Sequence, residues 1–167
     1  MKKFYKLSAG VLAVAAVAGC STNAPKATTQ TNAPVCKKAS EAEIAGLFDR
    51  WNTALKTGNP KTVVALYDKD SILLPTVSNK PRLTAAEKED YFVHFMEKKP
   101  AGTIDMRHIQ IGCNEAIDSG LYTFAFGKTG EKVGARYTYT YRWNGSEWKI
   151  SSHHSSALPE KPGAAAH

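Results

Sequence analysis

Polar and aromatic side chains alternate along the last third of the chain. From Arg136 to Trp143, hydroxyl-bearing or charged residues alternate with aromatic ones, the period of two that gives a β-strand two different faces. Asn144-Gly145 follows this run, and the dipeptide is typical of tight hairpin turns because it tolerates positive φ. The segment 148–156 then runs back and ends before Pro159. The pattern predicts a long antiparallel hairpin.

Apolar residues at helical spacing precede the hairpin. Ser40-x-x-Glu43 and Thr84-x-x-Glu87 are both typical of the capping box at a helix N-terminus. Asn59-Pro60 is typical of the start of another, shorter helix, with a cap residue followed by proline in the first turn. Three helices are therefore predicted. The first and third carry apolar faces made of Ile44, Leu47, Phe48, Trp51 and Leu55, and of Tyr91, Phe92, Phe95 and Met96.

The remaining apolar segments predict one short buried strand, at 72–74, and four long antiparallel strands. Helices that precede a run of strands indicate an α+β fold with the helices on one face of the sheet. A change in the parity of apolar positions between Met106 and Ile109 indicates a β-bulge that curves the sheet. We therefore expect a cone-shaped fold, in which a curved antiparallel sheet wraps around three N-terminal helices and encloses a cavity. The long strands are expected at 103–113, 116–126, 133–143 and 147–156.

The N-terminal segment has the features of an exported lipoprotein. Three lysines precede the apolar run Leu7–Ala18, which is too short to span a bilayer as a mature helix. Val17-Ala18-Gly19-Cys20 resembles the lipobox of bacterial lipoproteins, which implies cleavage before Cys20 and lipidation of its thiol. The alternative is an ordinary secretory signal. Ser21 after the cysteine implies, by the same resemblance, an outer membrane lipoprotein that faces the periplasm.

Composition divides the chain into a signal peptide at 1–19, a flexible tether at 20–38, a folded domain at 39–159 and a disordered tail at 160–167. The tether lacks isoleucine, leucine and aromatic residues, so it cannot bury enough surface to order itself. Without residues 1–19, 19 basic and 15 acidic residues leave a net charge of +4. The basic residues are scattered, which disfavours a nucleic-acid partner because phosphate binding needs a clustered basic face.

Two cysteines remain after lipidation, Cys36 and Cys113. In an oxidising compartment they favour a disulfide between the N-terminal arm and the sheet. The alternative is two unpaired thiols, with Cys113 as a small buried residue. They are far apart in the sequence and have no C-x-x-C partner, so no metal site is expected. No cofactor is expected either, because the chain has no G-x-G-x-x-G motif.

The domain carries a set of motifs that together resemble one superfamily. They are the hairpin from Arg136-Tyr137-Thr138 through Asn144-Gly145 to Trp148, the segment His153-His154-Ser155-Ser156 with Pro159, and Trp51, Leu74-Pro75 and Tyr91-Phe92. From about residue 40 to 159 the chain resembles the cone-shaped proteins related to nuclear transport factor 2, scytalone dehydratase, ketosteroid isomerase and the polyketide cyclases. It is most similar to the association (hub) domain of calcium/calmodulin-dependent protein kinase II and its bacterial stand-alone versions. The resemblance implies self-association through the convex face of the sheet, as dimers or larger rings, and a cavity open at one end.

Five residues are candidates for ligand binding in this cavity. Arg136 and Thr138 share a strand face, and a guanidinium that points into the cavity would pair with a carboxylate ligand. The alternative places Arg136 in solvent on the outer face of the sheet. His154 is expected to reach the cavity because strand alternation puts it on the face of Trp148 and Ile150, with His153 pointing away. Trp51 and Tyr91 are expected in the core or the cavity wall, Tyr67 in packing and Asp68 in solvent.

These features predict an exported, lipid-anchored homo-oligomer, a dimer or larger, that binds a small anionic or aromatic molecule or serves as a scaffold. The alternative is an enzyme of the isomerase, dehydratase or cyclase type, with His154 as the base and Arg136 as the electrophilic donor. A third interpretation is a structural envelope lipoprotein with a shrunken cavity. A cavity filled by the protein's own aromatic side chains would favour the scaffold.

Overall fold

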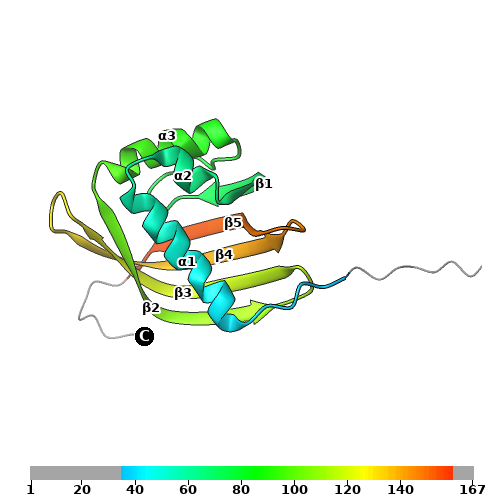
Figure 1. The fold of residues 1–167 in the computed structure, drawn as a ribbon. Coiled ribbons are helices and arrows are strands. Elements are labelled where there is room, and N and C mark those ends of the chain that lie inside the picture. The colour runs from blue at the N-terminus through cyan, green and yellow to red at the C-terminus, as the bar shows by residue number, and fades with distance from the viewer. Residues whose placement is uncertain (1–34, 160–167) are drawn as a thin grey trace, which may run out of the picture. The chain divides into compact units, whose positions relative to one another are not determined.

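The computed structural model of the protein describes residues 35–159. The predicted signal peptide, the lipidation site Cys20, most of the predicted tether and the predicted tail lie outside the described residues. Within the described part of the chain, no helix is long and apolar enough to cross a membrane. The elements in chain order are α1 (Glu41–Lys56), α2 (Pro60–Val64), β1 (Tyr67–Leu74), α3 (Ala85–Met96), β2 (Pro100–Ile111), β3 (Glu115–Phe126), β4 (Lys132–Trp143) and β5 (Trp148–Ala157) (Figure 1).

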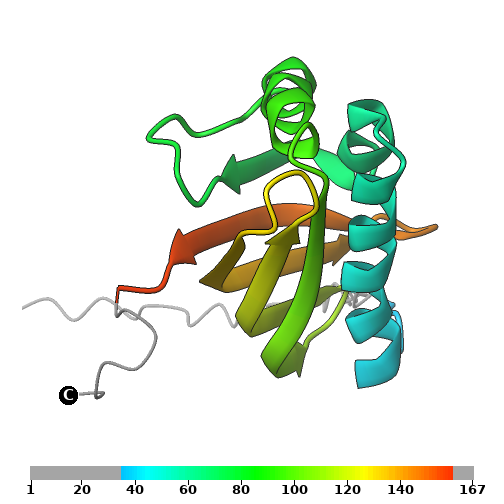
Figure 2. The same ribbon diagram turned by 90° about the vertical axis from the view of Figure 1, so that its left-hand side faces the viewer.

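The five strands form one curved sheet in the order β1-β5-β4-β3-β2 (Figures 1 and 2). Strands β2 to β5 are antiparallel neighbours, and β1 pairs in parallel with β5. Helix α1 crosses the inner face of the sheet, and α2 and α3 lie beside it near β1 (Figures 1 and 2). The predicted α+β fold with helices on one face of a curved sheet is confirmed. We call the side of the sheet that is turned away from α1 the outer face.

Strand β1 is longer than the predicted short strand and begins at Tyr67. Its pairing with β5 is interrupted between Tyr67 and Ile72. The interruption holds the polar run 68–70, Asp-Lys-Asp, which breaks the apolar pattern that a strand would otherwise show. Tyr67 therefore lies at the start of a strand, where its side chain is buried against the core.

Both predicted helix caps exist, but only one is a complete capping box. Thr84 accepts a hydrogen bond from the Glu87 backbone N–H, and the Glu87 carboxylate accepts one from the Thr84 backbone N–H. At α1, Ser40 accepts from the Glu43 backbone N–H at 3.2 Å, whereas the Glu43 carboxylate accepts from the Trp148 indole at 3.0 Å. A buried indole N–H needs an acceptor, and this contact takes Glu43 away from the cap.

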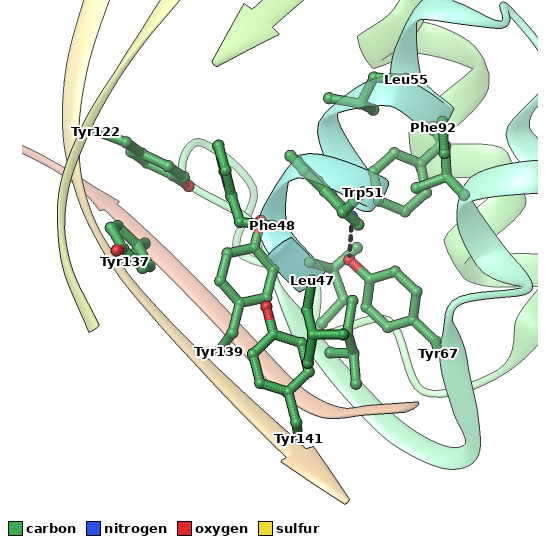
Figure 3. Packing of buried hydrophobic residues seen from close by; sticks show 14 of the residues in the cluster. Leu47, Phe48, Trp51, Leu55, Tyr67, Phe92, Tyr122, Tyr137, Tyr139 and Tyr141 are labelled. Carbon is green, nitrogen blue, oxygen red and sulfur yellow. Dashed lines mark hydrogen bonds between the residues drawn. The ribbon is translucent and has the colours of Figure 1, made fainter. Parts of the chain in front are cut away.

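Aromatic side chains fill the space between α1 and the sheet. Figure 3 shows Phe48 and Trp51 of α1 packed toward Tyr139 of β4, and their ring centroids lie 6.2 and 5.7 Å from that ring. On the same face of β4, Tyr137 and Tyr141 are also buried. The inside of the cone is therefore a packed aromatic core for most of its length.

The predicted disulfide between Cys36 and Cys113 is confirmed, with 4.8 Å between the two Cα atoms. It fixes the segment before α1 to the turn between β2 and β3. The Asn114 side chain accepts from the Lys37 backbone N–H at 2.7 Å and donates to the Val35 carbonyl at 3.1 Å. Residues 35–38, at the end of the predicted tether, thus lie against the folded domain.

Candidate functional site

A small cavity remains in the cone, where α3 and the end of β1 meet the inner faces of β3 and β5. Its volume is about 20 Å³, little more than the roughly 10–15 Å³ needed to hold one water molecule. One side of the cavity is aromatic and the other is polar. The aromatic side is formed by Trp51, Tyr91, Phe92, Phe95 and Phe124, and the polar side by Thr76, Tyr122, His153 and Ser155.

A chain of hydrogen bonds fixes the protonation of His153. The Trp51 indole N–H donates to the Tyr67 hydroxyl oxygen at 3.2 Å, and that hydroxyl lies 2.8 Å from Nδ1 of His153 (Figure 3 shows the first bond). The Tyr67 oxygen accepts from the Trp51 indole, and among the described residues His153 Nδ1 is the acceptor within reach of the buried Tyr67 O–H, so this hydroxyl donates to Nδ1. A neutral His153 therefore carries its proton on Nε2.

His153 is only 4% exposed, and its Nε2 has no hydrogen-bond partner among the described residues. Burial, with a smaller contribution from the charge of His154, lowers the pKa of His153 to about 3. The imidazole is therefore neutral at ordinary pH. It is a fixed hydrogen-bond donor at the cavity wall and a poor base.

Three hydroxyl groups form a second polar chain at the cavity. Tyr122 donates to Ser155 Oγ at 2.6 Å, and Ser155 Oγ is hydrogen-bonded to Thr76 Oγ1 at 2.5 Å. Burial raises the pKa of Tyr122 and that of Tyr91, to about 12 for Tyr91, so both phenols stay protonated. Among the described residues that line the cavity, none is a lysine, an arginine or an acid.

A buried ion pair lies elsewhere on the inner face. The Asp118 carboxylate is fully buried and accepts from the Tyr137 hydroxyl at 2.9 Å and from Arg107 Nε at 3.2 Å. Burial raises the pKa of Asp118, while the bond from Tyr137 and the charge of Arg107 oppose that rise. Arg107 also donates to the Ala45 carbonyl of α1 at 3.4 Å. The pair therefore joins α1 to β2, β3 and β4. Within residues 35–159, no group of three histidine, cysteine or acidic side chains is placed to hold a metal ion.

A sequence profile of the calcium/calmodulin dependent protein kinase II association domain matches residues 40–159. The chain belongs to this association-domain family. A structure from Xanthomonas campestris, proposed to be such an association domain, is 45% identical over 76% of this chain and 97% of its own, with a TM-score of 0.69. The family resemblance inferred from the sequence motifs is confirmed. No curated protein matches the chain significantly.

More distant structures share the fold of this association domain. An NTF2-like protein of unknown function from Pseudomonas putida KT2440 is 18% identical, with a TM-score of 0.64 and coverage of 80% of this chain and 96% of its own. An NTF2-like protein from Streptomyces avermitilis, proposed to be a dehydratase, is 14% identical, with a TM-score of 0.64 and coverage of 71% and 96%. At these identities the likeness shows the fold alone.

The structure places the five predicted ligand-binding residues of this association domain in two separate regions. Trp51 and Tyr91 line the cavity. Arg136 is exposed on the outer face, and Thr138 lies half-buried beside it, so the prediction that they face the cavity is wrong. The physical reason is that β4 has one face of tyrosines and one of polar residues, and burial of the larger aromatic area selects the tyrosine face for the core.

The prediction for the two histidines of β5 is also wrong, because His153 is buried and His154 is exposed. Thr140 pairs with Ser152 while Tyr141 pairs with Ile150, so β5 has one extra residue at this point. Such a bulge exchanges the two faces of the strand beyond it. The enzyme alternative required His154 and Arg136 at the cavity, and both lie on the opposite side of the sheet.

Sequence reasoning missed the polar side of the cavity. Tyr67 is buried as expected for packing, but its hydroxyl also links Trp51 to His153. Tyr122 and Ser155 were not candidates, although the period-two pattern of β3 could have placed Tyr122 inside with Phe124. No comparable signal existed for Ser155, because the bulge in β5 decides its face.

Proposed function

We propose that this protein is an exported, lipid-anchored scaffold that assembles with copies of itself through the outer face of its sheet. The observation that carries the proposal is a broad, uncovered sheet face. All helices of the described residues lie on the opposite side (Figures 1 and 2). The description of the family as an association domain points to oligomerisation.

The outer face combines partly exposed apolar side chains with hydroxyl groups. Met106 is 51% exposed and Ile117 is 36% exposed, and the half-buried Leu121 pairs with Met106 on one side and Arg136 on the other. Interface cores are depleted in charge and shielded by a polar rim, which fits this mixture. Three cross-strand rows make up the face: Met106, Leu121, Arg136 and Ser156; His108, Ser119, Thr138 and His154; and Gln110, Ile117, Thr140 and Ser152.

A two-fold symmetric pair suits such a surface, because the same patch then serves both subunits. The packed interior supports a scaffold for a different reason. Most of the cone is filled by Phe48, Trp51 and the tyrosines of β4, and the remaining cavity is about 20 Å³. That volume is far below the roughly 300–1,000 Å³ of ligand pockets that enclose a drug-sized molecule.

Two features support export. The segment that ends at Cys20 resembles a lipoprotein signal, and the Cys36–Cys113 disulfide belongs to an oxidising compartment. Lipidation at Cys20 followed by the segment 21–34 would hold the domain close to a membrane surface. Several such domains on one membrane would meet at a high local concentration, which favours assembly.

Sedimentation velocity of the mature chain tests self-association. We expect a dimer or larger assembly for the wild type and an at least 100-fold weaker association for Ile117→Glu, because like charges would be buried opposite each other. Val93→Glu is the matched control, since Val93 is a similarly exposed apolar residue (44%) on α3. A wild type that stays monomeric at high micromolar concentration would contradict the proposal. So would dissociation by Val93→Glu but not by Ile117→Glu.

A further inference from the structure

The Nε2 atom of His153 is a buried donor that lacks a protein acceptor among the described residues. A buried donor without an acceptor costs about 1–3 kcal/mol, so such a group is kept where another molecule satisfies it. The bonds from Trp51 to Tyr67 and from Tyr67 to His153 hold the ring so that the proton stays on Nε2. The cavity therefore offers one donor of fixed identity.

From this geometry we infer that the cavity binds the carbonyl-type oxygen of a small, uncharged aromatic molecule, which accepts a hydrogen bond from His153 Nε2. This site is independent of the outer face and of self-association. A single water molecule is the simplest competitor for the same donor, and the test below separates the two.

The charge of the cavity decides the class of ligand. A carboxylate would be buried there without a cation, because none of the described lining residues is a lysine or an arginine and His153 is neutral. The Arg82 guanidinium over the Tyr91 ring is not a lining residue and is already paired with Asp90 at 2.7 Å. An isolated buried charge is far more costly than a buried neutral acceptor. An ammonium group would be an isolated buried charge as well, because none of the described lining residues is an acid. A neutral oxygen acceptor is left as the group that fits.

The size and walls of the cavity decide which part of the ligand enters it and what the remainder contacts. A volume of about 20 Å³ admits only the oxygen-bearing head of a ligand. Tyr91 and Phe95 line the cavity and are half-buried. Their rings stack on each other at 5.7 Å and 14°, and the Arg82 guanidinium lies over the Tyr91 ring at 5.8 Å, so a ligand would meet the edges of the two rings. Aromatic rings pack favourably edge-to-face. The body of the ligand would therefore lie against Tyr91 while its oxygen reaches inward.

Side-chain nitrogen NMR of the mature chain tests the inference directly. We expect His153 to be observed as the Nε2–H tautomer. Three probes of similar size then separate the classes: acetophenone has a neutral carbonyl, benzoate is anionic, and ethylbenzene has no acceptor. Acetophenone should shift the His153 Nε2–H resonance and bind at least tenfold more tightly than benzoate or ethylbenzene.

Neighbouring histidines provide matched variants. His153→Phe should abolish the acetophenone response, and His154→Phe, on the exposed side of the same strand, should leave it unchanged. The wild-type experiments decide the matter even if His153→Phe does not fold. An Nδ1–H tautomer, benzoate binding as tight as acetophenone binding, or no shift at millimolar acetophenone would each overturn the inference. The last outcome would leave a cavity that holds water only.

Discussion

At the scale of single residues, the Tyr67 hydroxyl connects two buried polar side chains, Trp51 and His153, that have no other hydrogen-bond partner within residues 35–159. It accepts from Trp51 and donates to His153, and burial raises its own pKa well above the usual value. The phenol therefore keeps its hydrogen over the whole physiological range. The bond to Tyr67 fixes which nitrogen of His153 carries the proton, and burial keeps the ring neutral, which has a consequence for the stability of the fold.

His153 makes the stability of the fold depend on pH. Its pKa is about 3 in the folded chain and about 6.5 in an unfolded chain, so between these values only the unfolded state binds the proton. The contribution of neutral His153 to the free energy of unfolding is therefore fully present above about pH 6.5 and is lost as the pH falls from about 6.5 to about 3. Between pH 7 and pH 5 we expect the free energy of unfolding, measured by urea titration, to fall by about 2 kcal/mol from this group.

One buried group opposes this effect. Burial raises the pKa of Asp118, so protonation of Asp118 favours the folded state as the pH falls, and variants of the histidines are needed to isolate the contribution of His153. His154→Ala should show the same loss between pH 7 and pH 5 as the wild type, because His154 is exposed. His153→Gln should be less stable but nearly independent of pH there. An unchanged slope in His153→Gln would contradict the assignment.

At the scale of elements, two bulges decide the shape of the sheet. In β2 the register shifts between Ile104 and Met106, slightly before the position at which the parity of the sequence changes. The bulge brings the Met106 carbonyl close to Gly120 of β3, where a Cβ atom would lie 1.9 Å from the carbonyl oxygen. The curvature therefore requires glycine at position 120.

Two glycine substitutions test this requirement with opposite expected signs. Gly120→Ala should lower the free energy of unfolding by about 3 kcal/mol, because the backbone of β2 must move away from the new methyl group. Gly46→Ala should raise it by about 1 kcal/mol, since Gly46 lies inside α1 with no atom within 4 Å of the added Cβ. Chemical denaturation measures both. A Gly120→Ala variant as stable as the wild type would show that the strands can separate at little cost.

The same bulges explain how far the sequence could predict the molecule. Regular features such as the alternation along β4, the cap of α3 and the turn at Asn144-Gly145 were predictable, because each depends on neighbours in the sequence. The bulge in β5 falls at Ser151-Ser152, where two polar residues follow each other and neither face is marked as apolar. The sequence therefore could not predict which face of the sheet His153 and His154 occupy. Contacts between distant segments, such as Glu43 with Trp148, were equally hidden.

At the scale of the whole molecule, the two faces of the sheet have different chemistry. The inner face is aromatic and nearly filled, with one water-sized cavity beside His153. The outer face is mixed, partly apolar and uncovered by any described helix (Figure 2). A ligand at the first face and a second copy at the second would therefore bind independently. The proposed export of this domain rests on its cysteines: lipidation at Cys20 and the disulfide between Cys36 and Cys113.

Export should change the cysteines chemically, by lipidation of Cys20 and by oxidation of Cys36 and Cys113. In cells that process lipoproteins, we expect the full-length chain to take up radioactive palmitate and Cys20→Ala to take up none. In the same exported protein, titration of the denatured chain should find Cys36 and Cys113 oxidised. Because the bridge joins residues 77 positions apart, reduction should lower the free energy of unfolding by about 2–4 kcal/mol.

A double variant separates the bridge from other effects of reductant. The chain with Cys36→Ala and Cys113→Ala should have the stability of the reduced wild type and should not respond to reductant, because no other disulfide is formed within residues 35–159. Urea titrations with and without dithiothreitol provide the comparison. Two free thiols in the exported protein would remove the argument for an oxidising compartment. Palmitate uptake by Cys20→Ala would contradict lipidation at that residue. Self-association would then have to occur without the higher local concentration that a lipid anchor at Cys20 would provide.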